Sequence, residues 1–377
     1  MDRISIAYPV FRGNERKYVD ECIDTSWVSA NGRFVKEFQQ GFADFCGCKY
    51  GLACSNGTVT LHLALIALGI KPGDEVIMPT LTYIATANAV RMVGATPVFV
   101  ESDPDTWNVS PEAIEKAITP RTKAIIPVHL YGLSCDMTAI MDIANKHNIP
   151  VVEDAAEAHG AKWDGKVVGS MGAIGSFSFF GNKIITCGEG GMIVTNDEEL
   201  FNTMKLYHSQ GVDPKQKRYW HLVSGYNYRM TNMQAAVGLA QLEDIEWHIA
   251  QRRRVAGIYN KLFKEKLDGL VKVQRVNDPE NHVYWMNCIM LTDKVKKDRD
   301  QVMAEMEEKN IEMRPLFYPM HVMPPFEDKS VTFPIAEKIG SRGICLPTHA
   351  GMDDEKIEYV VKCLKDIIVE KSTGKVY

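Results

Sequence analysis

The chain has no uninterrupted apolar stretch long enough to cross a bilayer, and its first residues do not combine a basic start with an apolar core. We therefore expect a cytoplasmic protein without a signal peptide. It also has no excess of basic charge, because the formal net charge is −5, and this argues against a general nucleic-acid-binding protein. Internal repeats, low-complexity segments and a flexible interdomain linker are lacking as well.

Metal and dinucleotide signatures are missing too. The nine cysteines are scattered and odd in number, and Cys46 and Cys48 form only a C-x-C without a second pair at zinc spacing. We expect reduced core cysteines and no metal. No G-x-G-x-x-G follows the first expected strand, which argues against a dinucleotide-dependent dehydrogenase. What is present is 377 residues of ordinary globular composition, 45% hydrophobic and 24% charged, enough for two domains.

Short apolar runs alternate with helical patterns through the first part of the chain. This alternation predicts an α/β fold with a mostly parallel sheet covered by helices on both faces. The predicted strands are residues 51–55, 76–79, 94–100, 124–128, 151–152, 176–180 and 192–195, and the predicted helices between them include 85–93 and 138–147.

The last third of the chain has a different pattern. Residues 232–267 have apolar and charged residues at helical spacing, which predicts one long helix, and the basic run 252–254 is expected on its solvated face. Further strands are predicted at 284–291 and 314–318, and further helices at 336–340 and 355–369. We therefore expect a large domain over residues 1–240 and a smaller C-terminal α+β domain over residues 241–377.

Lys183 is the most informative single residue. A lone lysine is usually a solvated surface charge, but Lys183 is flanked by apolar and glycine residues in the run from Ser176 to Gly191. Earlier in the chain, Asp154 follows an apolar run where a buried strand would end, and ligands of open α/β sheets bind at such ends.

An amine and a carboxylate of this kind are what pyridoxal phosphate (PLP) requires. The aldehyde forms a Schiff base with a lysine, and a carboxylate beside the ring nitrogen keeps the pyridinium protonated, so that it can accept electrons. The carboxylate does so by raising the pKa of the nitrogen, because a nearby anion favours the charged form.

A phosphate site is predicted at Ser55-Asn56-Gly57-Thr58, where a strand gives way to a helix. The free N–H groups and the dipole of a helix N-terminus favour an anion, and Gly57 allows close approach. On its own, this segment would be read as an ordinary helix cap by Ser55 or Asn56. Ser178, five residues before Lys183, could add a hydroxyl, or could simply bond to backbone.

Together these segments resemble the PLP-dependent nucleotide-sugar aminotransferases of the DegT/DnrJ/EryC1 family. The resemblance is carried by residues 176–191, by Glu153 to Gly160, by Ser55-Asn56-Gly57-Thr58 and by Gly225-Tyr226-Asn227-Tyr228-Arg229-Met230. It covers nearly the whole chain. It implies the aspartate-aminotransferase-like fold (fold type I), with the large and small domains described above.

The resemblance also implies roles for individual residues. Lys183 would hold PLP and would later move a proton as general base and acid, and Asp154 would pair with the pyridinium nitrogen. Glu157 would lie near the phenolic oxygen of the cofactor, where many relatives have Gln, so a proton must be shared there. The other implied cofactor contacts are Tyr83 and Ala156 on the two ring faces, Gly57, Thr58 and Ser178 at the phosphate, and Asn227 from the other subunit of a homodimer.

Substrates are implied through three segments, residues 79–85, 178–183 and 317–321, which are similar to members that act on GDP-4-dehydro-6-deoxy-D-mannose (a GDP-4-keto-6-deoxymannose) with L-glutamate, in O-antigen biosynthesis. A dTDP- or UDP-linked sugar is the alternative. The resemblance disfavours a sugar dehydratase of the same fold, because members of that group have His at the position of the Schiff-base lysine, and this chain has Lys183 there. A PLP-binding regulator would need a DNA-binding module, for which the two domains leave no room.

Several polar residues have two open interpretations. Arg229 could bind the carboxylate of the donor or form a structural ion pair. Tyr318 and His321 lie in a proline-rich segment that could contact the nucleotide or serve as a rigid connection. His129 and His159 lie near strand ends, where a core histidine with satisfied hydrogen bonds is the more frequent outcome.

Overall fold

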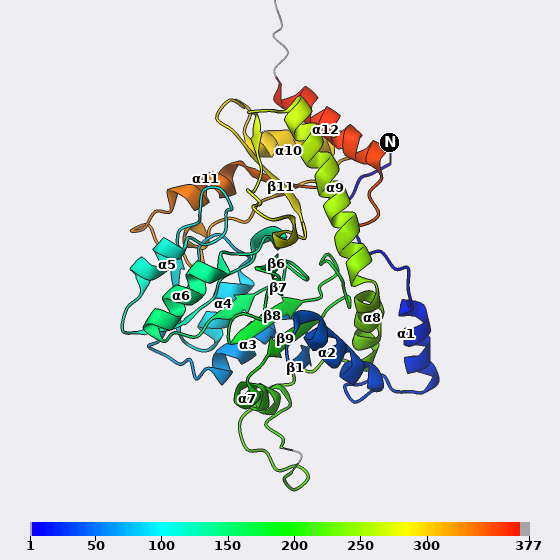
Figure 1. Ribbon diagram of the computed structural model, residues 1–377, viewed down its shortest axis with the longest axis vertical. Helices are drawn as coiled ribbons and strands as arrows, with labels where there is room; N and C mark the ends of the chain where they lie inside the picture. Colours follow the sequence, from blue (N-terminus) through cyan, green and yellow to red (C-terminus); the bar gives the residue numbers. More distant parts are fainter. Residues whose placement is uncertain (1, 214, 370–377) are drawn as a thin grey trace, which may run out of the picture.

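One continuous sheet forms the centre of the computed structural model, which describes residues 2–213 and 215–369 (Figure 1). Its strands are β1 (Tyr50–Cys54), β2 (Glu75–Pro79), β3 (Thr96–Val100), β4 (Thr122–Ile125), β5 (Val152–Asp154), β8 (Ile174–Ser178) and β9 (Gly191–Thr195). They lie in the orders β1-β9-β8-β5 and β3-β2-β4, and parallel bridges from Ile125 to Val151 and from Val128 to Asp154 join the two groups. A small hairpin, β6 (Lys162–Trp163) and β7 (Lys166–Val167), lies outside this sheet.

The predicted mostly parallel α/β sheet is confirmed, with one strand as the exception. Strand β2 is parallel to β3 and β4, and β5 is parallel to β8. Strand β9 is antiparallel to both β1 and β8. All five residues of β9 are buried, and a fully buried strand has the same apolar pattern in either direction, so the sequence alone does not reveal its orientation.

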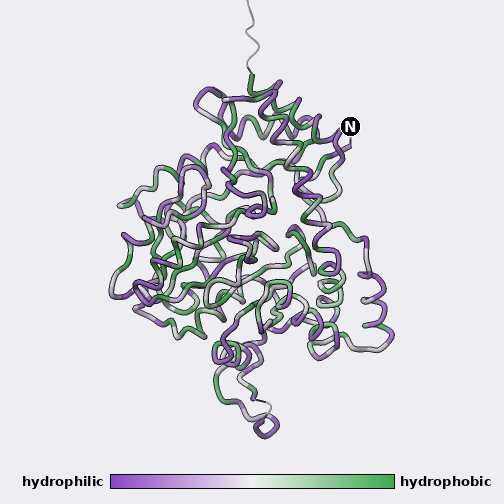
Figure 2. The backbone as a smooth tube through the Cα atoms, viewed as in Figure 1, coloured by the Kyte–Doolittle hydropathy of each residue, from purple (hydrophilic) through white to green (hydrophobic). Residues whose placement is uncertain are grey.

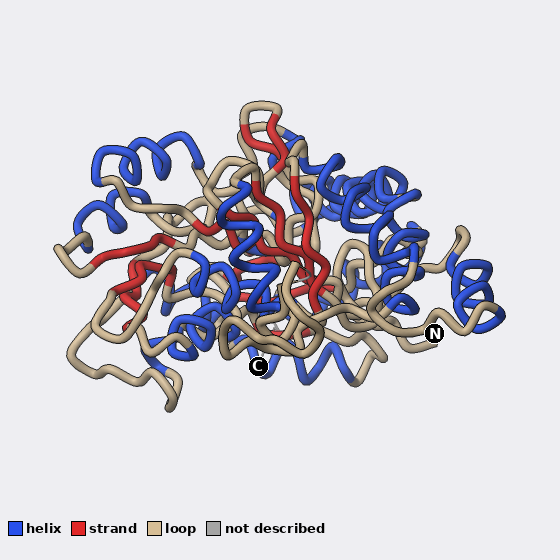
Figure 3. Tube along the Cα trace, turned by 90° about the horizontal axis from the view of Figure 1, so that it is seen from below, coloured by secondary structure: helices blue, strands red, loops and turns tan. Residues whose placement is uncertain are grey.

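Helices lie on both sides of this sheet, as Figure 3 shows with blue helices flanking the red strands. Side-chain caps fix where several of them begin: Asn56, Ser110, Asp136 and Asp197 each accept a hydrogen bond from a backbone N–H of the first turn. The helices before residue 210 are α1 (Glu15–Asp24), α2 (Arg33–Cys46), α3 (Gly57–Ala67), α4 (Ala85–Met92), α5 (Pro111–Ala117), α6 (Met137–His147) and α7 (Glu198–His208), with a short 3₁₀ helix η1 (Leu130–Gly132).

A second, smaller sheet is formed by the C-terminal part of the chain. It contains β10 (Val271–Lys272), β11 (Asn287–Leu291), β12 (Arg314–Pro315) and β13 (Gly343–Leu346). Its order is β10-β11-β13-β12, and every pair is antiparallel. The helices of this part are α10 (Arg299–Glu307), α11 (Pro334–Arg342) and α12 (Asp354–Ile368), with 3₁₀ helices η2 (Pro279–Asn281) and η3 (Met320–Val322).

The single long helix predicted for residues 232–267 is two helices, α8 (Asn232–Glu243) and α9 (Ile245–Lys266). Asp244 breaks the run with φ −110° and ψ 15°, and its carboxylate pairs with Arg12 at 3.1 Å. The break is a single residue that is neither Gly nor Pro, so the hydrophobic period continues across it. The predicted division between residues 240 and 241 falls inside α8 and stays a prediction.

Hydrophobic packing is continuous between the two sheets. Phe38 and Phe177 of the large sheet region belong to the same buried cluster as Trp285, Leu316 and Ile339 of the C-terminal part. Figure 2 shows the contrast between α8, which is mostly hydrophobic, and the exposed α1, which is mostly hydrophilic. The C-terminal part also has a cluster of its own, built on α9, α10 and α12. Groups from both sheets can therefore meet in one site.

Membrane-spanning helices and clusters of metal ligands are both missing from the described residues. None of the helices in residues 2–213 and 215–369 is long and apolar enough to cross a membrane. In the same residues, no group of three or more His, Cys, Asp or Glu side chains is placed to hold a metal ion. The nine cysteines are free and buried.

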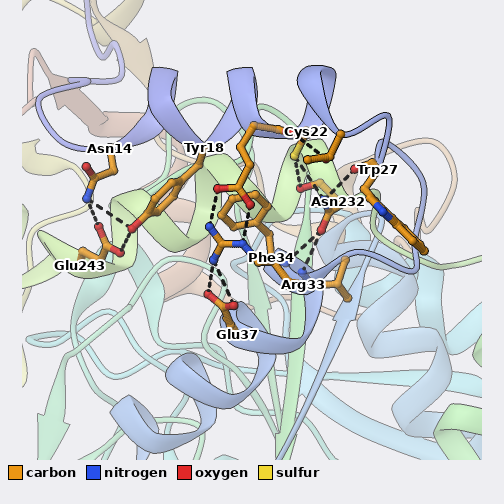
Figure 4. A network of polar contacts seen from close by, with 12 residues as sticks. Asn14, Tyr18, Cys22, Trp27, Arg33, Phe34, Glu37, Asn232 and Glu243 are labelled. Atoms are coloured by element: carbon orange, nitrogen blue, oxygen red, sulfur yellow. Dashed lines mark hydrogen bonds and ion pairs between the residues drawn. The ribbon is translucent and has the colours of Figure 1, made fainter.

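Asn232, at the start of α8, provides the N-terminal cap of a different helix. Its Oδ1 accepts hydrogen bonds from the backbone N–H groups of Phe34 (3.0 Å) and Val35 (3.4 Å), in the first turn of α2, and its Nδ2 donates to Trp27 O (2.7 Å) (Figure 4). The residue at the N-cap position of α2 is Gly32, which has no side chain to do this. A Cβ at Gly32 would lie 1.9 Å from Cγ of Asn232, so the glycine leaves the space that the amide occupies.

This arrangement predicts that Gly32→Ala destabilises the protein, although φ of Gly32 is −81° and suits any residue. The displaced amide of Asn232 would leave buried N–H groups unpaired, and we expect a loss of about 2 kcal/mol in the free energy of unfolding. The matched control is Gly257→Ala in α9, where a Cβ would meet nothing within 4 Å, and which should stabilise by about 0.5–1 kcal/mol. Urea unfolding of both variants measures this. Equal effects of the two substitutions would contradict the role of Asn232.

Candidate active site

Three strands that run in the same direction end at one edge of the large sheet. Strands β1 and β8 are both antiparallel to β9, and β5 is parallel to β8. Their last residues are Cys54, Ser178 and Asp154, so the segments that follow them meet at this edge. The carboxyl edge of such a sheet is where ligands bind, and the predicted site residues are brought together here.

The predicted phosphate cradle forms where α3 begins. Asn56 caps the helix, since its Oδ1 accepts from Val59 N at 3.1 Å. The N–H groups of the first helical residues, Gly57 and Thr58, have no partner inside the helix. A Cβ at Gly57 would lie 2.8 Å from the Cβ of Ser178. The Gly57 backbone therefore packs directly against the Ser178 side chain, beside free N–H groups that favour an anion, and any larger residue at position 57 would collide with Ser178.

Asp154 is buried at the end of β5 and is held in place by two donors. Thr86 Oγ1 donates to its Oδ2 at 2.8 Å, and Ala156 N donates to its Oδ1 at 3.2 Å. Burial raises the pKa of Asp154, and the bonds from Thr86 and Ala156, with the charge of Lys183, act in the opposite direction. A buried carboxylate of this kind is suited to pair with a cationic ring nitrogen. Thr86 was not predicted, because a threonine in a helix gives no sign of a distant carboxylate partner.

The neighbouring Glu153 fixes the strand end that presents Asp154. It is fully buried and accepts hydrogen bonds from the N–H groups of Gly169 (2.6 Å), Met171 (2.7 Å) and Gly172 (2.6 Å). His129 Nε2 lies 3.1 Å from it, and Nδ1 of the same ring accepts from a backbone N–H. The interpretation of His129 as a core histidine with satisfied hydrogen bonds is confirmed.

Lys183 lies in the connection between β8 and β9, where its N–H donates to Phe180 O at 2.9 Å. Its Nζ lies 3.8 Å from the centroid of the Trp285 ring. Burial lowers the pKa of Lys183, while the charges of Glu157 and Asp154 raise it. The predicted amine and carboxylates therefore form one electrostatic group.

Glu157 is positioned by a strained backbone. Its Oε2 accepts from Tyr131 N at 2.6 Å, and Tyr131 has φ 57°, in the left-handed region that non-glycine residues rarely adopt. Burial raises the pKa of Glu157, and the charge of Lys183 and the bond from Tyr131 lower it. A left-handed residue beside a buried carboxyl is typical of a functional site.

An aromatic wall lines one side of this group, and it consists of Tyr83, Phe317, Tyr131 and Trp285. Successive ring centroids along it are 5.8, 5.0 and 6.1 Å apart. Trp285 and Phe317 come from the C-terminal part of the chain. Tyr83, at the outer end, is 59% exposed. Only Tyr83 was predicted as a site residue. Phe317 lies in the segment 317–321 that carries part of the resemblance but was given no role, and Tyr131 and Trp285 come from segments without a recognised motif.

Arg252 corrects a prediction. It was expected on the solvated face of a helix, but it is 3% exposed and bonds to carbonyl oxygens. Its Nη1 donates to Trp285 O (2.9 Å), and its Nη2 donates to Lys183 O (3.2 Å). Burial lowers the pKa of Arg252 to about 10. Its neighbour Arg253 also binds carbonyl groups, those of His282 and Glu280, while Arg254 pairs with Asp354. The run of three arginines joins the long helix to the C-terminal part.

The predicted substrate contacts Arg229, Tyr318 and His321, and the predicted contact with the partner's phosphate, Asn227, divide into exposed and buried residues. Asn227 and Arg229 are exposed, and Arg229 Nε donates to Asn227 Oδ1 at 3.1 Å. Tyr318 is 46% exposed and its hydroxyl accepts from Arg299 at 2.8 Å. His321 is buried, with Thr80 Oγ1 2.8 Å from its Nδ1 and Glu337 Oε1 3.0 Å from its Nε2. The His321 ring thus has both nitrogens engaged, as a rigid connection requires.

The residues at this edge fit PLP. The cradle at Gly57 and Ser178 suits a phosphate, the buried Asp154 suits a pyridinium, and the Lys183 amine lies in the same electrostatic group. The half-buried Ala156 follows Asp154 closely and places a small side chain beside it. Chemically, this set can hold an anion, stabilise a cationic ring and move a proton at Lys183 Nζ.

Comparison with known proteins gives consistent results. The chain matches the DegT/DnrJ/EryC1/StrS aminotransferase family over residues 9–365. It is 52% identical over 370 residues to GDP-perosamine synthase of Caulobacter vibrioides, covering 98% of this chain and 99% of that protein. It is 46% identical over 371 residues to GDP-perosamine synthase of Escherichia coli O157:H7, covering 98% of this chain and 100% of that protein. The crystal structure of 3-amino-5-hydroxybenzoic acid synthase has a TM-score of 0.90 at 30% identity, covering 97% of this chain and 99% of that one.

His159 lies directly behind the site, among Phe42, Phe177 and Phe179. It is fully buried, and neither ring nitrogen makes a hydrogen bond of good geometry among the described residues, although a weaker contact with the Ser178 backbone favours its charged form. It is therefore a core histidine, as expected, but without the expected satisfied bonds. Burial, with a smaller contribution from the charge of Lys183, lowers the pKa of His159 to about 3.

This environment predicts a pH-dependent stability. A histidine whose folded pKa is about 3 stays neutral in the folded protein, while the unfolded chain binds a proton below a pKa of about 6.5. Its contribution is present above pH 6.5 and is lost as the pH falls towards 3. Relative to His159→Leu, the wild-type protein should lose about 2 kcal/mol between pH 7 and pH 5. Urea unfolding across this range measures the difference, and the exposed His147→Gln serves as control. Parallel wild-type and His159→Leu profiles would exclude the effect.

Proposed function

Because the chain belongs to the DegT/DnrJ/EryC1/StrS aminotransferase family, we propose that it transfers the amino group of L-glutamate to the C4 keto carbon of GDP-4-dehydro-6-deoxy-D-mannose. The products are GDP-perosamine and 2-oxoglutarate. GDP-perosamine synthases that are 42–52% identical to this chain over almost its whole length support this choice of substrate. The observation that carries the proposal is the electrostatic group of Lys183, Asp154 and Glu157 at the carboxyl edge of the sheet.

The cofactor of this enzyme is pyridoxal phosphate. Its predicted aspartate-aminotransferase-like fold is confirmed by the agreement with a solved aminotransferase structure over nearly the whole chain. When bound, the cofactor stores the amino group of the donor and stabilises negative charge at the reacting carbon. We propose that Lys183 anchors it, that Asp154 pairs with its ring nitrogen, and that the N–H groups of Gly57 and Thr58 and the hydroxyl of Ser178 bind its phosphate. Tyr83 and Ala156 are the proposed contacts on its two faces.

Lys183 Nζ is the proposed general base and acid. Its lowered pKa increases the neutral fraction that can accept a proton, and the nearby carboxylates then stabilise the ammonium that forms. Glu157 supplies the complementary group. Because burial favours its neutral form and Oε2 already accepts from Tyr131, we propose that a proton is held at Oε1 when an anionic oxygen lies beside it.

The substrate side of the proposal depends on exposed groups. Among the described residues Arg229 is engaged only through Nε, with Asn227, which leaves its outer nitrogens to bind the carboxylate of glutamate. Tyr318 is the proposed nucleotide contact. His321 does not fit that role in this arrangement, since both of its ring nitrogens are engaged by Thr80 and Glu337. We propose instead that His321 fixes the segment that carries Tyr318.

We further propose a homodimer with shared sites, in which Asn227 contacts the phosphate held by the partner subunit. Large hydrophobic side chains exposed on several segments, including the 219–222 loop, support an interface with a second copy. They include Trp27 (56%), Tyr83 (59%), Phe180 (48%), Tyr219 (78%) and Trp220 (53%). A cytoplasmic location and a role in O-antigen biosynthesis complete the proposal, and the nine free cysteines are typical of a reducing compartment.

The substrate is tested with GDP-, dTDP- and UDP-linked 4-keto-6-deoxyhexoses, with glutamate as donor and 2-oxoglutarate as readout. We expect the GDP sugar to have a kcat/KM at least about tenfold higher than the others, because a mismatched base leaves buried polar groups unpaired. Lys183→Ala should lose both the visible absorbance of bound PLP and all product. If a dTDP or UDP sugar is preferred, the protein is still an aminotransferase, but the assignment of GDP-perosamine as its product is wrong. If none yields 2-oxoglutarate, aminotransfer from glutamate is wrong.

Shared sites are tested by mixing two inactive variants, Lys183→Ala and Asn227→Asp. The second adds like-charge repulsion against the phosphate. A mixed dimer has one site with both native residues, so random exchange of subunits should restore about a quarter of wild-type activity. Exchange is verified with subunits that carry two different affinity tags. Exchange without recovery would place Asn227 outside the partner's site.

A further inference from the structure

Trp285 contacts the Lys183 segment at two points. Its ring lies under the Lys183 ammonium, with Nζ 3.8 Å from the ring centroid. Its indole N–H donates to the carbonyl oxygen of Asn182, the preceding residue, at 2.8 Å. One side chain of the C-terminal part therefore contacts both the charged end and the backbone of the lysine segment.

The position of Trp285 is itself fixed. It is 6% exposed, and its ring stacks on Tyr131 with an interplanar angle of 13°. The carbonyl oxygen of Trp285 accepts from Arg252 Nη1, while Nη2 of the same guanidinium donates to Lys183 O. The arginine thus ties the two residues together through their backbones. A ring held this firmly presents its face at a defined place.

The charged groups around Lys183 explain why a ring face is useful there. Asp154 and Glu157 attract the ammonium, while the Arg252 guanidinium donates to the carbonyl oxygen of Lys183 and the neutral His159 adds no charge. Lys183 Nζ donates no hydrogen bond to any residue that the structure describes. The negative face of an indole ring stabilises a cation, and most strongly where water is excluded.

We propose that Trp285 is a positioning residue for the reaction, and that its indole face holds Lys183 Nζ whenever this nitrogen is not covalently bonded. The inference rests on the proposed aminotransfer, in which Lys183 must be released before it can move a proton. A released lysine on a flexible side chain would otherwise sample many rotamers. The indole keeps it beside Asp154 and Glu157, at the place where the proton is needed.

The test is the rate at which the cofactor-free, full-length protein captures added PLP, followed by absorbance as a function of pH. Capture requires the neutral amine, so the midpoint of the rate profile reports the ionisation of Lys183. Trp285→Leu keeps the site apolar but removes the ring face, and its midpoint should shift to lower pH by about 0.5–1 unit. Trp285→Phe keeps a ring without the indole N–H, and should shift by clearly less.

Trp247→Leu is the matched control, because it removes an indole ring that also lies beside a cation, the guanidinium of Arg12 at 4.5 Å, but has no contact with Lys183 Nζ. Its midpoint should equal that of the wild-type protein. Equal shifts in Trp285→Leu and Trp285→Phe would assign the effect to the bond with Asn182 and overturn the proposal. An unshifted Trp285→Leu would overturn it as well. Since this assay needs no sugar or glutamate, its outcome is separate from that of the aminotransfer assay.

A second measurement does not depend on cofactor binding or on a Trp285 variant. The ultraviolet difference spectrum of the cofactor-free protein is recorded against pH, alongside Lys183→Met, which replaces the ammonium by an uncharged side chain of similar length. An ammonium over an indole perturbs its absorption, so the wild-type protein should show an indole band that titrates with the midpoint of PLP capture. The band should be missing in Lys183→Met. Identical titrations of the two proteins would place the ammonium away from the ring and overturn the proposal.

Discussion

Three ionisable groups, Lys183, Asp154 and Glu157, share a poorly solvated space, and the surrounding structure is arranged around this constraint. Each would be costly alone, because a buried charge without a partner destabilises a protein by several kcal/mol. Thr86 and a backbone N–H support Asp154, the left-handed Tyr131 supports Glu157, and Trp285 faces Lys183. The strain at Tyr131 and the irregular connection around Lys183 are therefore tolerated because they bring compensating groups to the charges.

The two sheets make different contributions to this space. The large sheet supplies what local sequence can encode: strand ends, a glycine at a helix start, and a carboxylate after an apolar run. The C-terminal part supplies Trp285, Phe317 and the carbonyl groups that Arg252 binds. Because one hydrophobic cluster includes residues of both parts, the position of the lysine depends on packing between them. A displacement of the C-terminal sheet would therefore shift the position of Lys183, even if no catalytic residue were substituted.

Most of the fold and the centre of the site could be predicted from sequence, since each depends on a short segment. Hydrophobic periodicity and helix caps predict helices α3, α4 and α6 and strands β2 and β8. Asp154 is predicted by its place after an apolar run, and Lys183 by its apolar and glycine neighbours. The break at Asp244, the direction of β9 and the burial of Arg252 could not, because each is decided by contacts with segments far away in the chain. Thr86 and Trp285 were missed for the same reason, while His321 shows that a polar residue in a family-like segment can be wholly occupied by structural bonds.

The cap that Asn232 provides for α2 has a consequence for how this sequence can change over time. Gly32 and Asn232 depend on each other: a side chain at position 32 collides with the amide, and loss of the amide leaves the start of α2 without an acceptor. A serine at position 32 could cap its own helix, but only after Asn232 has become smaller, and either substitution made first is harmful. The two positions are therefore coupled by epistasis. Homologous chains should have either Gly at position 32 with Asn at position 232, or a capping side chain at 32 with a smaller residue at 232, and seldom one change without the other.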